Sequence, residues 1–232
     1  MKTKIFCDSA DYSTIKEFNN NSLVSGFTTN PSLMKQSGAK NYKNYSLKLL
    51  KVCKKKPISL EVFADDHQNM IRQAKKINTW GKNVYVKIPV INSKGQFTGK
   101  VINKLNNQNI KLNITAVYNS NQAKKILKVI NKKTKVIISI FAGRAADTGK
   151  NPIPEFKKSL KLAKKFKNVD ILWASVREPY NYLQAKELGC HIITIPPAII
   201  EKIEKFGKSF NRLTLETVKG FLIDSRKSRF RI

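Results

Sequence analysis

The chain has 232 residues, of which 41% are hydrophobic and 26% charged, the proportions expected of a soluble globular protein with a substantial core. Its net charge of +30 comes mainly from lysines that are scattered, often in pairs, along the whole length, without an arginine and aromatic stripe, an RNP-like motif or zinc-finger spacing. This distribution argues against nucleic-acid binding and favours solvated helix faces, with a polyanion-binding protein left as an alternative.

The apolar runs, cysteines and histidines limit the possible classes further. No apolar run approaches the roughly 18 residues that a membrane-spanning helix needs, and the N-terminal run is too short for a signal peptide. Cys7, Cys53 and Cys190 are odd in number and lack metal-ligand spacing, while His67 and His191 lie far apart. We therefore expect a reduced, cytoplasmic protein without membrane contact and without a histidine-rich metal site.

Short apolar segments typical of buried strands alternate with lysine-rich segments whose apolar residues recur at helical spacing. Pro31, Pro154 and Asn119 or Ser120 indicate where several of these helices begin. In chain order, the expected strands span residues 4–8, 23–29, 58–64, 83–90, 111–117, 136–142, 169–175 and 191–195.

Eight strands that alternate with helices predict a parallel sheet, which closes most naturally into a single (β/α)8 TIM barrel domain formed by residues 1–232. An open doubly wound sheet is the rival architecture, but no Gly-x-Gly-x-x-Gly motif follows the first strand. Residues after about 205 predict an additional C-terminal helix and a basic tail.

Polar residues interrupt or directly follow seven of these strands, near the end at which barrel enzymes carry their active sites. Side chains two apart on a strand share a face, so such residues can meet inside a barrel. Each has a structural alternative: Lys87 could extend to solvent or pair with Glu61, Asp8 could begin a helix, and Asn30 could form a turn before Pro31. Their convergence favours a site. The candidates are Asp8, Asn30, Glu61, Lys87, Asn113, Thr115, Ser139, Phe141, Ser175 and Arg177.

Lys87 lies in the apolar segment VYVKIPV, where low polarity disfavours an ammonium ion and makes the free amine a nucleophile. A free amine in a barrel mouth can form a Schiff base with a carbonyl compound, after which an adjacent carbon–carbon bond can break. Asp8 and Glu61 are the carboxylates available for proton transfer, and Thr115 could hold a water molecule. The planar fork of an arginine side chain can bind a phosphate group through two hydrogen bonds. Arg144 and Arg177, together with Ser175, could bind a phosphate in this way.

Seven segments resemble the short form of the transaldolase family, in the same order along the chain. The resemblance implies a barrel enzyme without metal or cofactor that moves a dihydroxyacetone unit between sugar phosphates through a lysine Schiff base. It also implies the pentose phosphate pathway and a homo-oligomer of five or ten chains. The segments are DSAD (8–11), GFTTNPSLM (26–34), SLEVF (59–63), VYVKIPV (84–90), NITAVYNSNQA (113–123), SIFAGRAADTG (139–149) and ILWASVREP (171–179).

The same resemblance implies a role for each candidate residue. Lys87 would form the imine, Asp8 would act as acid and base on the sugar hydroxyl, and Glu61 and Thr115 would position the catalytic water. The residues that would bind the substrate and its phosphate are Thr29, Asn30, Asn113, Ser139, Phe141, Arg144, Ser175 and Arg177.

Fructose-6-phosphate aldolases, which belong to the same family, release dihydroxyacetone instead of transferring it. They carry glutamine where this chain has Glu61 and tyrosine where it has Phe141. A tyrosine hydroxyl can help to protonate the enamine, whereas phenylalanine cannot. These two residues favour a transaldolase, with the aldolase as the alternative.

Overall fold

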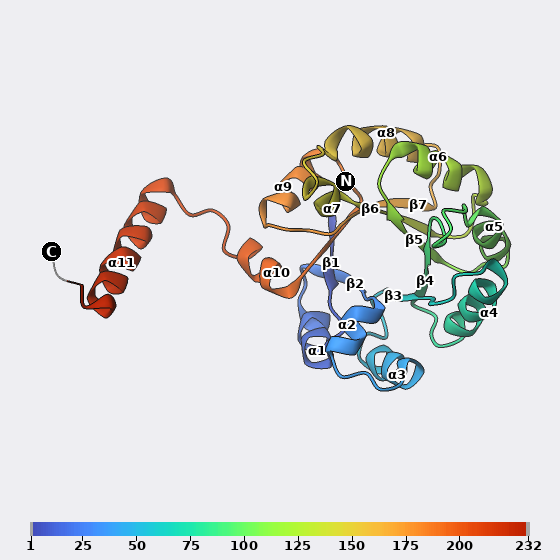
Figure 1. The fold of residues 1–232 in the computed structure, drawn as a ribbon, viewed down its shortest axis with the longest axis horizontal. Coiled ribbons are helices and arrows are strands. Elements are labelled where there is room, and N and C mark those ends of the chain that lie inside the picture. Colours follow the sequence, from blue (N-terminus) through green and yellow to red (C-terminus); the bar gives the residue numbers. More distant parts are fainter. Residues whose placement is uncertain (1, 231–232) are drawn as a thin grey trace.

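A closed barrel of eight parallel strands forms the centre of the protein, as the computed structural model of residues 2–230 shows (Figure 1). Each strand pairs with its neighbours in chain order, and the last strand pairs with the first. The predicted barrel is therefore confirmed, and the open sheet is excluded. The strands are β1 (Lys4–Asp8), β2 (Val24–Thr28), β3 (Ile58–Glu61), β4 (Val84–Pro89), β5 (Leu112–Val117), β6 (Val136–Phe141), β7 (Val169–Ala174) and β8 (Ile192–Ile195).

Helices surround the barrel, and the connections after β2 and β6 contain two helices each. They are α1 (Tyr12–Asn20), α2 (Pro31–Gln36), α3 (Tyr42–Val52), α4 (His67–Asn78), α5 (Gly99–Asn107), α6 (Ser120–Val129), α7 (Ala142–Ala146), α8 (Ile153–Ala163), α9 (Tyr180–Glu187), α10 (Pro197–Ile203) and α11 (Phe210–Ser228).

Local side-chain chemistry explains where several helices begin. Asp11 caps α1 by accepting a hydrogen bond from the Thr14 amide, and Asn30 caps α2 in the same way, with Pro31 as the first helical residue. Asn119 and Gln122 form a reciprocal capping box at α6. These caps satisfy amides that a helix leaves without partners, so the short connections end in defined helix starts.

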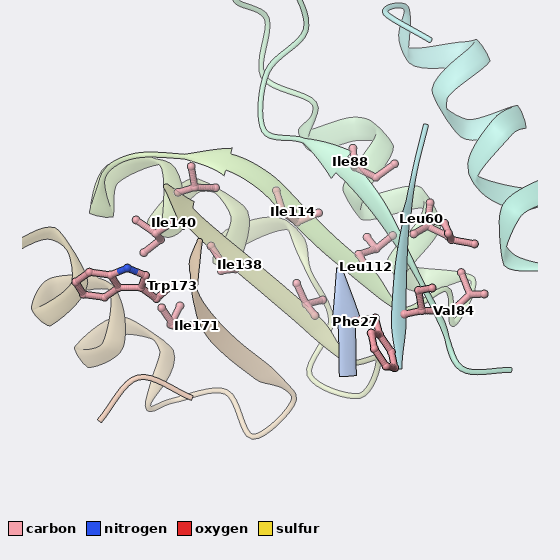
Figure 2. Close-up of a cluster of buried hydrophobic side chains, with 14 of the residues drawn as sticks. Phe27, Leu60, Val84, Ile88, Leu112, Ile114, Ile138, Ile140, Ile171 and Trp173 are labelled. Atoms are coloured by element: carbon pink, nitrogen blue, oxygen red, sulfur yellow. The ribbon is translucent and has the colours of Figure 1, made fainter. Parts of the chain in front are cut away.

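Two apolar layers hold the barrel together, one outside and one inside the strands. Every second strand residue points outward and packs beneath the helices, as Figure 2 shows for Ile138, Ile140, Ile171 and Trp173. Burial of each such side chain stabilises the fold by about 1.5–3 kcal/mol. The intervening residues point inward, and near the N-terminal ends of the strands they form a small apolar cluster. This cluster, called the floor below, contains Phe6, Tyr85, Ile137, Leu172 and Ile192.

The floor depends on one glycine. A Cβ at Gly26 would lie 2.7 Å from carbon atoms of the Phe6 ring, so the ring occupies the space that any other residue at position 26 would need. Phe6 thereby closes the bottom of the barrel, and the inward residues above it surround a cavity.

The C-terminal helix α11 differs from the other helices because it extends away from the barrel (Figure 1). Within the described chain, none of its residues is buried, and Phe210, Val218 and Phe221 are more than half exposed. The predicted extra helix is thus present, beginning at Phe210. No helix in residues 2–230 combines the length and the apolar character required to cross a membrane.

Candidate active site

A cavity of about 230 Å³ opens at the C-terminal ends of the strands, directly above the floor. It receives residues from β1, β2, β4, β5, β6, β7 and β8 and from the segments that follow β2, β6, β7 and β8. Its lining residues are Asp8, Thr28, Asn30, Lys87, Asn113, Thr115, Ser139, Phe141, Arg144, Ala174, Ser175, Val176, Arg177, Thr194 and Pro196. Most of the candidates from the sequence therefore meet in one place.

Lys87 lies between this cavity and an adjoining depression of about 400 Å³ that contains Glu61. The two residues are register partners on β4 and β3, and Lys87 Nζ is 3.2 Å from Glu61 Oε2. The same Nζ donates a hydrogen bond of 3.0 Å to the Thr29 carbonyl oxygen. The pairing of Lys87 with Glu61, kept as an alternative from the sequence, is therefore present: the buried lysine has a carboxylate within ion-pair distance.

Asp8 ends β1 on the opposite side of the cavity, and its environment favours the protonated carboxyl group. Burial raises the pKa of Asp8, while the positive charge of Lys87 and a hydrogen bond from Thr28 oppose that shift. Thr28 Oγ1 donates to Asp8 Oδ1 at 2.6 Å. The alternative that Asp8 begins a helix is excluded, because Asp11 caps α1.

A chain of hydroxyl groups extends from Asp8 across the barrel. Thr28 Oγ1 lies 2.5 Å from Thr194 Oγ1, and the single hydroxyl hydrogen of Thr28 is used toward Asp8. Thr194 is therefore the donor to Thr28 while Asp8 is ionised. Neither threonine was identified from the sequence, although Thr28 is the register partner of Asp8 and Thr194 lies at an alternating position of β8.

Asn113 is held in one orientation by two buried serines. Its Nδ2 donates to Ser59 Oγ at 2.9 Å, and Ser139 Oγ donates to its Oδ1 at 2.6 Å. Ser59 escaped the sequence analysis because a lone hydroxyl in a strand carries little information. The network fixes a polar amide beside Lys87, its register partner on β4.

Thr115, two residues further along β5, has a buried hydroxyl without a hydrogen-bond partner among the described residues. The next residue, Ala116, has a φ of 58°, and the register between β5 and β6 shifts between Ile114 and Val117. A positive φ is strained for alanine, and such strain is concentrated at functional sites. Thr115 is a lining residue of both the cavity and the depression, so its hydroxyl, unpaired within the described chain, lies at their junction.

Thr29 and Asn30 occupy different environments although they are neighbours. Asn30 lines the cavity, and its Oδ1 also accepts the Leu33 amide hydrogen to cap α2. Thr29 is fully buried, and its hydroxyl donates to the Ser59 carbonyl oxygen at 2.8 Å. Thr29 is not among the lining residues, and its carbonyl oxygen contacts Lys87, so its predicted part in substrate binding would act through Lys87 and the backbone.

Arg144 and Arg177 line both this cavity and a larger outer depression of about 820 Å³. Arg144 lies over the Phe141 ring, with its guanidinium carbon 5.7 Å from the ring centroid. A Cβ at Gly143 would fall 1.7 Å from the Ser175 carbonyl oxygen, which makes glycine necessary where α7 meets the end of β7. Ser175 itself has a φ of 65°, so the segment that carries Arg177 leaves the strand through a strained backbone.

The cysteines lie outside this arrangement. All three are free and buried, and burial raises the pKa of Cys7 and of Cys190 to about 12, which leaves both thiols protonated at neutral pH. Within residues 2–230, no three or more His, Cys, Asp or Glu side chains are grouped as metal ligands.

The chain is similar in sequence to one known protein family along nearly its whole length. A family model described as transaldolase/fructose-6-phosphate aldolase matches residues 5–231. A protein of Nitrosopumilus maritimus named probable transaldolase is 36% identical over 97% of this chain and 95% of its own length. A probable transaldolase of Methanococcus vannielii is 32% identical over 92% of this chain and 94% of its own length.

Solved structures share the architecture at much lower sequence identity. A 3-hexulose-6-phosphate synthase aligns with a TM-score of 0.60 at 12% identity, covering 87% of this chain and 92% of its own. A protein described as KGPDC from Streptococcus mutans aligns with a TM-score of 0.59 at 10% identity, covering 87% and 91% of the two chains. These two likenesses show a common barrel fold.

Proposed function

The chain belongs to the transaldolase/fructose-6-phosphate aldolase family, and we propose that it is a transaldolase that works through a Schiff base on Lys87. The observation that carries this proposal is the position of the Lys87 amine, which lies within 3.2 Å of one carboxylate and shares a cavity with another. The donor would be sedoheptulose 7-phosphate and the acceptor glyceraldehyde 3-phosphate, as in the pentose phosphate pathway.

Imine formation begins with the loss of a proton from Lys87. Glu61 is placed to take that proton, after which the neutral amine attacks the ketone carbon of the sugar. The resulting carbinolamine loses its hydroxyl group as water, and the imine forms with the lysine nitrogen. Glu61 and Thr115 would hold this water, since the buried Thr115 hydroxyl has its hydrogen-bonding capacity free among the described residues.

Carbon–carbon cleavage requires a base on the other side of the substrate. Asp8 would take the proton of the C4 hydroxyl group; the electrons of the C3–C4 bond then move into the protonated imine, and the aldose leaves with a new carbonyl group. The raised pKa suits Asp8 to this step, because it makes the carboxylate a stronger proton acceptor than an exposed aspartate. The enamine that remains on Lys87 adds to the acceptor aldehyde in the reverse sequence.

The other lining residues would hold the substrate. The fixed amide of Asn113 and the side chain of Asn30 would bind hydroxyl groups of the three-carbon unit, beside Ser139 and Phe141. Arg144, Arg177 and Ser175 would bind the phosphate at the outer end of the cavity. The net charge of +30 would draw phosphorylated sugars toward the barrel.

Transfer, as distinct from release of dihydroxyacetone, is supported by Phe141. The ring lines the cavity and packs near Tyr118 and Arg144, with centroid distances of 5.9 Å and 5.7 Å. It has no hydroxyl group to protonate the enamine, so the intermediate persists until an aldehyde arrives. Glu61 in contact with Lys87 supports the same assignment.

We further propose a cytoplasmic homo-oligomer of five or ten chains in which α11 contacts another copy. Its exposed apolar residues Phe210, Val218 and Phe221 support this, because nothing within the described chain buries them. Truncation after Gly207 should reduce the size measured by light scattering during gel filtration. An unchanged size would reject α11 as the contact.

The reaction is tested by acceptor dependence. Purified protein is mixed with fructose 6-phosphate, with or without erythrose 4-phosphate, and the release of glyceraldehyde 3-phosphate is followed. We expect sustained release only with the acceptor, because without it each site frees a single equivalent and retains the three-carbon unit. Release without it, accompanied by free dihydroxyacetone, would identify a fructose-6-phosphate aldolase and refute the interpretation of Glu61 and Phe141.

A further inference from the structure

Arg177 is bound along one edge by a carboxylate from another element. Its Nε lies 3.0 Å from Asp147 Oδ1 and 3.1 Å from Oδ2, and its Nη2 donates to Oδ2 at 2.5 Å. Asp147 follows α7, whereas Arg177 follows β7. The hydrogen bonds leave the Nη1 end of the guanidinium group with its N–H donors free for another ligand.

The two residues differ in what they face. Arg177 lines the inner cavity with Lys87 and also the outer depression, whereas Asp147 lines only the outer depression. The Asp147 carboxylate therefore binds the Arg177 guanidinium on the side of the outer depression, and it does not line the inner cavity that contains Lys87. The hydrogen bond from Arg177 keeps the pKa of Asp147 below its usual range, so the carboxylate is ionised at neutral pH.

Further contacts restrict the rest of Arg177. Its backbone amide donates to Asn181 Oδ1 at 3.0 Å, and a Cβ at Gly143 would lie 3.1 Å from its Cγ. The backbone amide and one guanidinium edge are thus held by hydrogen bonds, and the aliphatic stem passes close to the Gly143 backbone. The short helix α7 carries Gly143 and Arg144, and Asp147 directly follows it, so a single segment shapes the surroundings of Arg177.

We propose that Asp147 is a positioning residue that orients the Arg177 fork toward the inner cavity and thereby sets the affinity for the substrate phosphate. The inference rests on the proposed function for the identity of the substrate, but the anion site itself is assigned from the contacts of Arg177. A long arginine side chain loses considerable rotamer freedom when it binds an anion, and a preformed orientation reduces that loss.

The sign of the effect separates orientation from simple electrostatics. A carboxylate near a phosphate site repels the phosphate, so removal of Asp147 would tighten phosphate binding if charge alone mattered. If Asp147 orients Arg177, its removal weakens binding despite the gain in positive charge. Asp65 offers a matched control, because it is another exposed carboxylate on a loop after a strand, and it accepts hydrogen bonds from Ser93 and not from an arginine.

The test compares wild type, Asp147→Ala, Asp147→Asn and Asp65→Asn by calorimetric titration with inorganic phosphate and by steady-state kinetics with fructose 6-phosphate at a fixed concentration of erythrose 4-phosphate. We expect Asp147→Ala to weaken phosphate binding about tenfold and to raise KM about tenfold, with kcat changed less than about twofold. Asp147→Asn retains one oxygen acceptor and should lose only about threefold. Asp65→Asn should bind phosphate as wild type does.

Unchanged or tighter phosphate binding by Asp147→Ala would overturn the inference, as would an equal loss in Asp65→Asn. A fall in kcat with unaltered phosphate affinity would also overturn it. Phosphate titration requires no turnover, so the predicted loss of affinity in a protein that lacks transaldolase activity would refute the proposed function and leave the role of Asp147 supported. Melting temperatures of the variants establish that each is folded before it is titrated.

Discussion

Two layers of side chains fill the barrel interior, and they differ sharply although the same strands supply both. Positions two residues apart change from Phe6 to Asp8 on β1 and from Tyr85 to Lys87 on β4. The lower layer, the floor, is apolar and closed by the ring of Phe6 against Gly26. The upper layer contains charges and hydroxyl groups joined by hydrogen bonds.

The barrel therefore places its stabilising contacts and its reactive groups at different heights along the same strands. The floor contributes favourable burial and excludes solvent from below, whereas burial of Asp8 in the upper layer disfavours its charged form. Substitutions in the upper layer should therefore affect the reaction most strongly. Substitutions in the floor should affect the free energy of unfolding.

The largest effect is expected from Lys87→Ala in the upper layer. Loss of the only proposed nucleophile should reduce transfer by at least about 10⁴-fold, since covalent catalysis then has no amine. A coupled assay for glyceraldehyde 3-phosphate measures it. Lys111→Met is the control, because Lys111 lies near the other end of the barrel, with its ammonium 5.2 Å from the centroid of the Tyr85 ring, and the variant should remain active. A comparable loss of transfer activity in Lys87→Ala and Lys111→Met would show that the reaction does not depend specifically on the lysine of the upper layer.

The next effect is expected from Asp8→Asn. The amide cannot accept the proton of the sugar hydroxyl group, so kcat should fall by about 10²–10⁴-fold while the imine still forms on Lys87. Rapid quenching with borohydride, followed by mass spectrometry, reports imine formation independently of turnover. Normal turnover would exclude Asp8 from the reaction.

In the floor, Leu172→Ala should lower the free energy of unfolding by about 2–5 kcal/mol, because Leu172 is fully buried and its removal leaves a cavity. Its effect on kcat should be far smaller than that of Asp8→Asn. Leu183→Ala, at a position that is 40% exposed, should change stability by less than about 0.5 kcal/mol. Denaturant unfolding measures the free energy of unfolding of both variants. An equal decrease in the two would show that the floor contributes no more to stability than an exposed position does.

The smallest effect concerns stability and pH. The pKa of Asp8 in the folded protein is raised above its usual value of 3.8, so the folded state binds this proton more tightly than the unfolded state does. The contribution of Asp8 to stability therefore declines as pH rises above about 3.8 toward the folded pKa. Asp8→Asn removes that decline, and its melting temperature relative to wild type should increase between acidic and neutral pH. A constant difference would contradict the burial of an ionisable group at position 8.

The sequence predicted the fold well because every barrel strand is a short apolar segment, and polar residues interrupt or directly follow seven of the eight expected strands. All eight expected segments contain an observed strand, with boundaries that differ by up to three residues. Lys87 and Asp8 were visible as charges within or next to such segments. The placement of α11 was not predictable, because its apolar residues indicate a packing partner without specifying where the helix lies.

The residues of the site that the sequence did not reveal have roles that depend on contacts formed only in the folded chain. Thr28, Ser59 and Thr194 are hydroxyl residues, which strands accept readily at any position, so their roles follow only from the hydrogen bonds that the barrel creates. Asp147 follows a short helix, and only the folded chain brings it to Arg177. The burial of Thr29 beside the cavity-lining Asn30 was likewise not predictable, because neighbouring residues at a strand end can face different ways.

The proposed imine on Lys87 can be trapped by reduction with borohydride. The protein is incubated with fructose 6-phosphate and sodium borohydride, digested, and analysed by peptide mass spectrometry. We predict that the peptide containing Lys87 gains the mass of a reduced dihydroxyacetone unit and that Lys87→Ala gains none. A modification on another lysine, or none in wild type, would contradict the account.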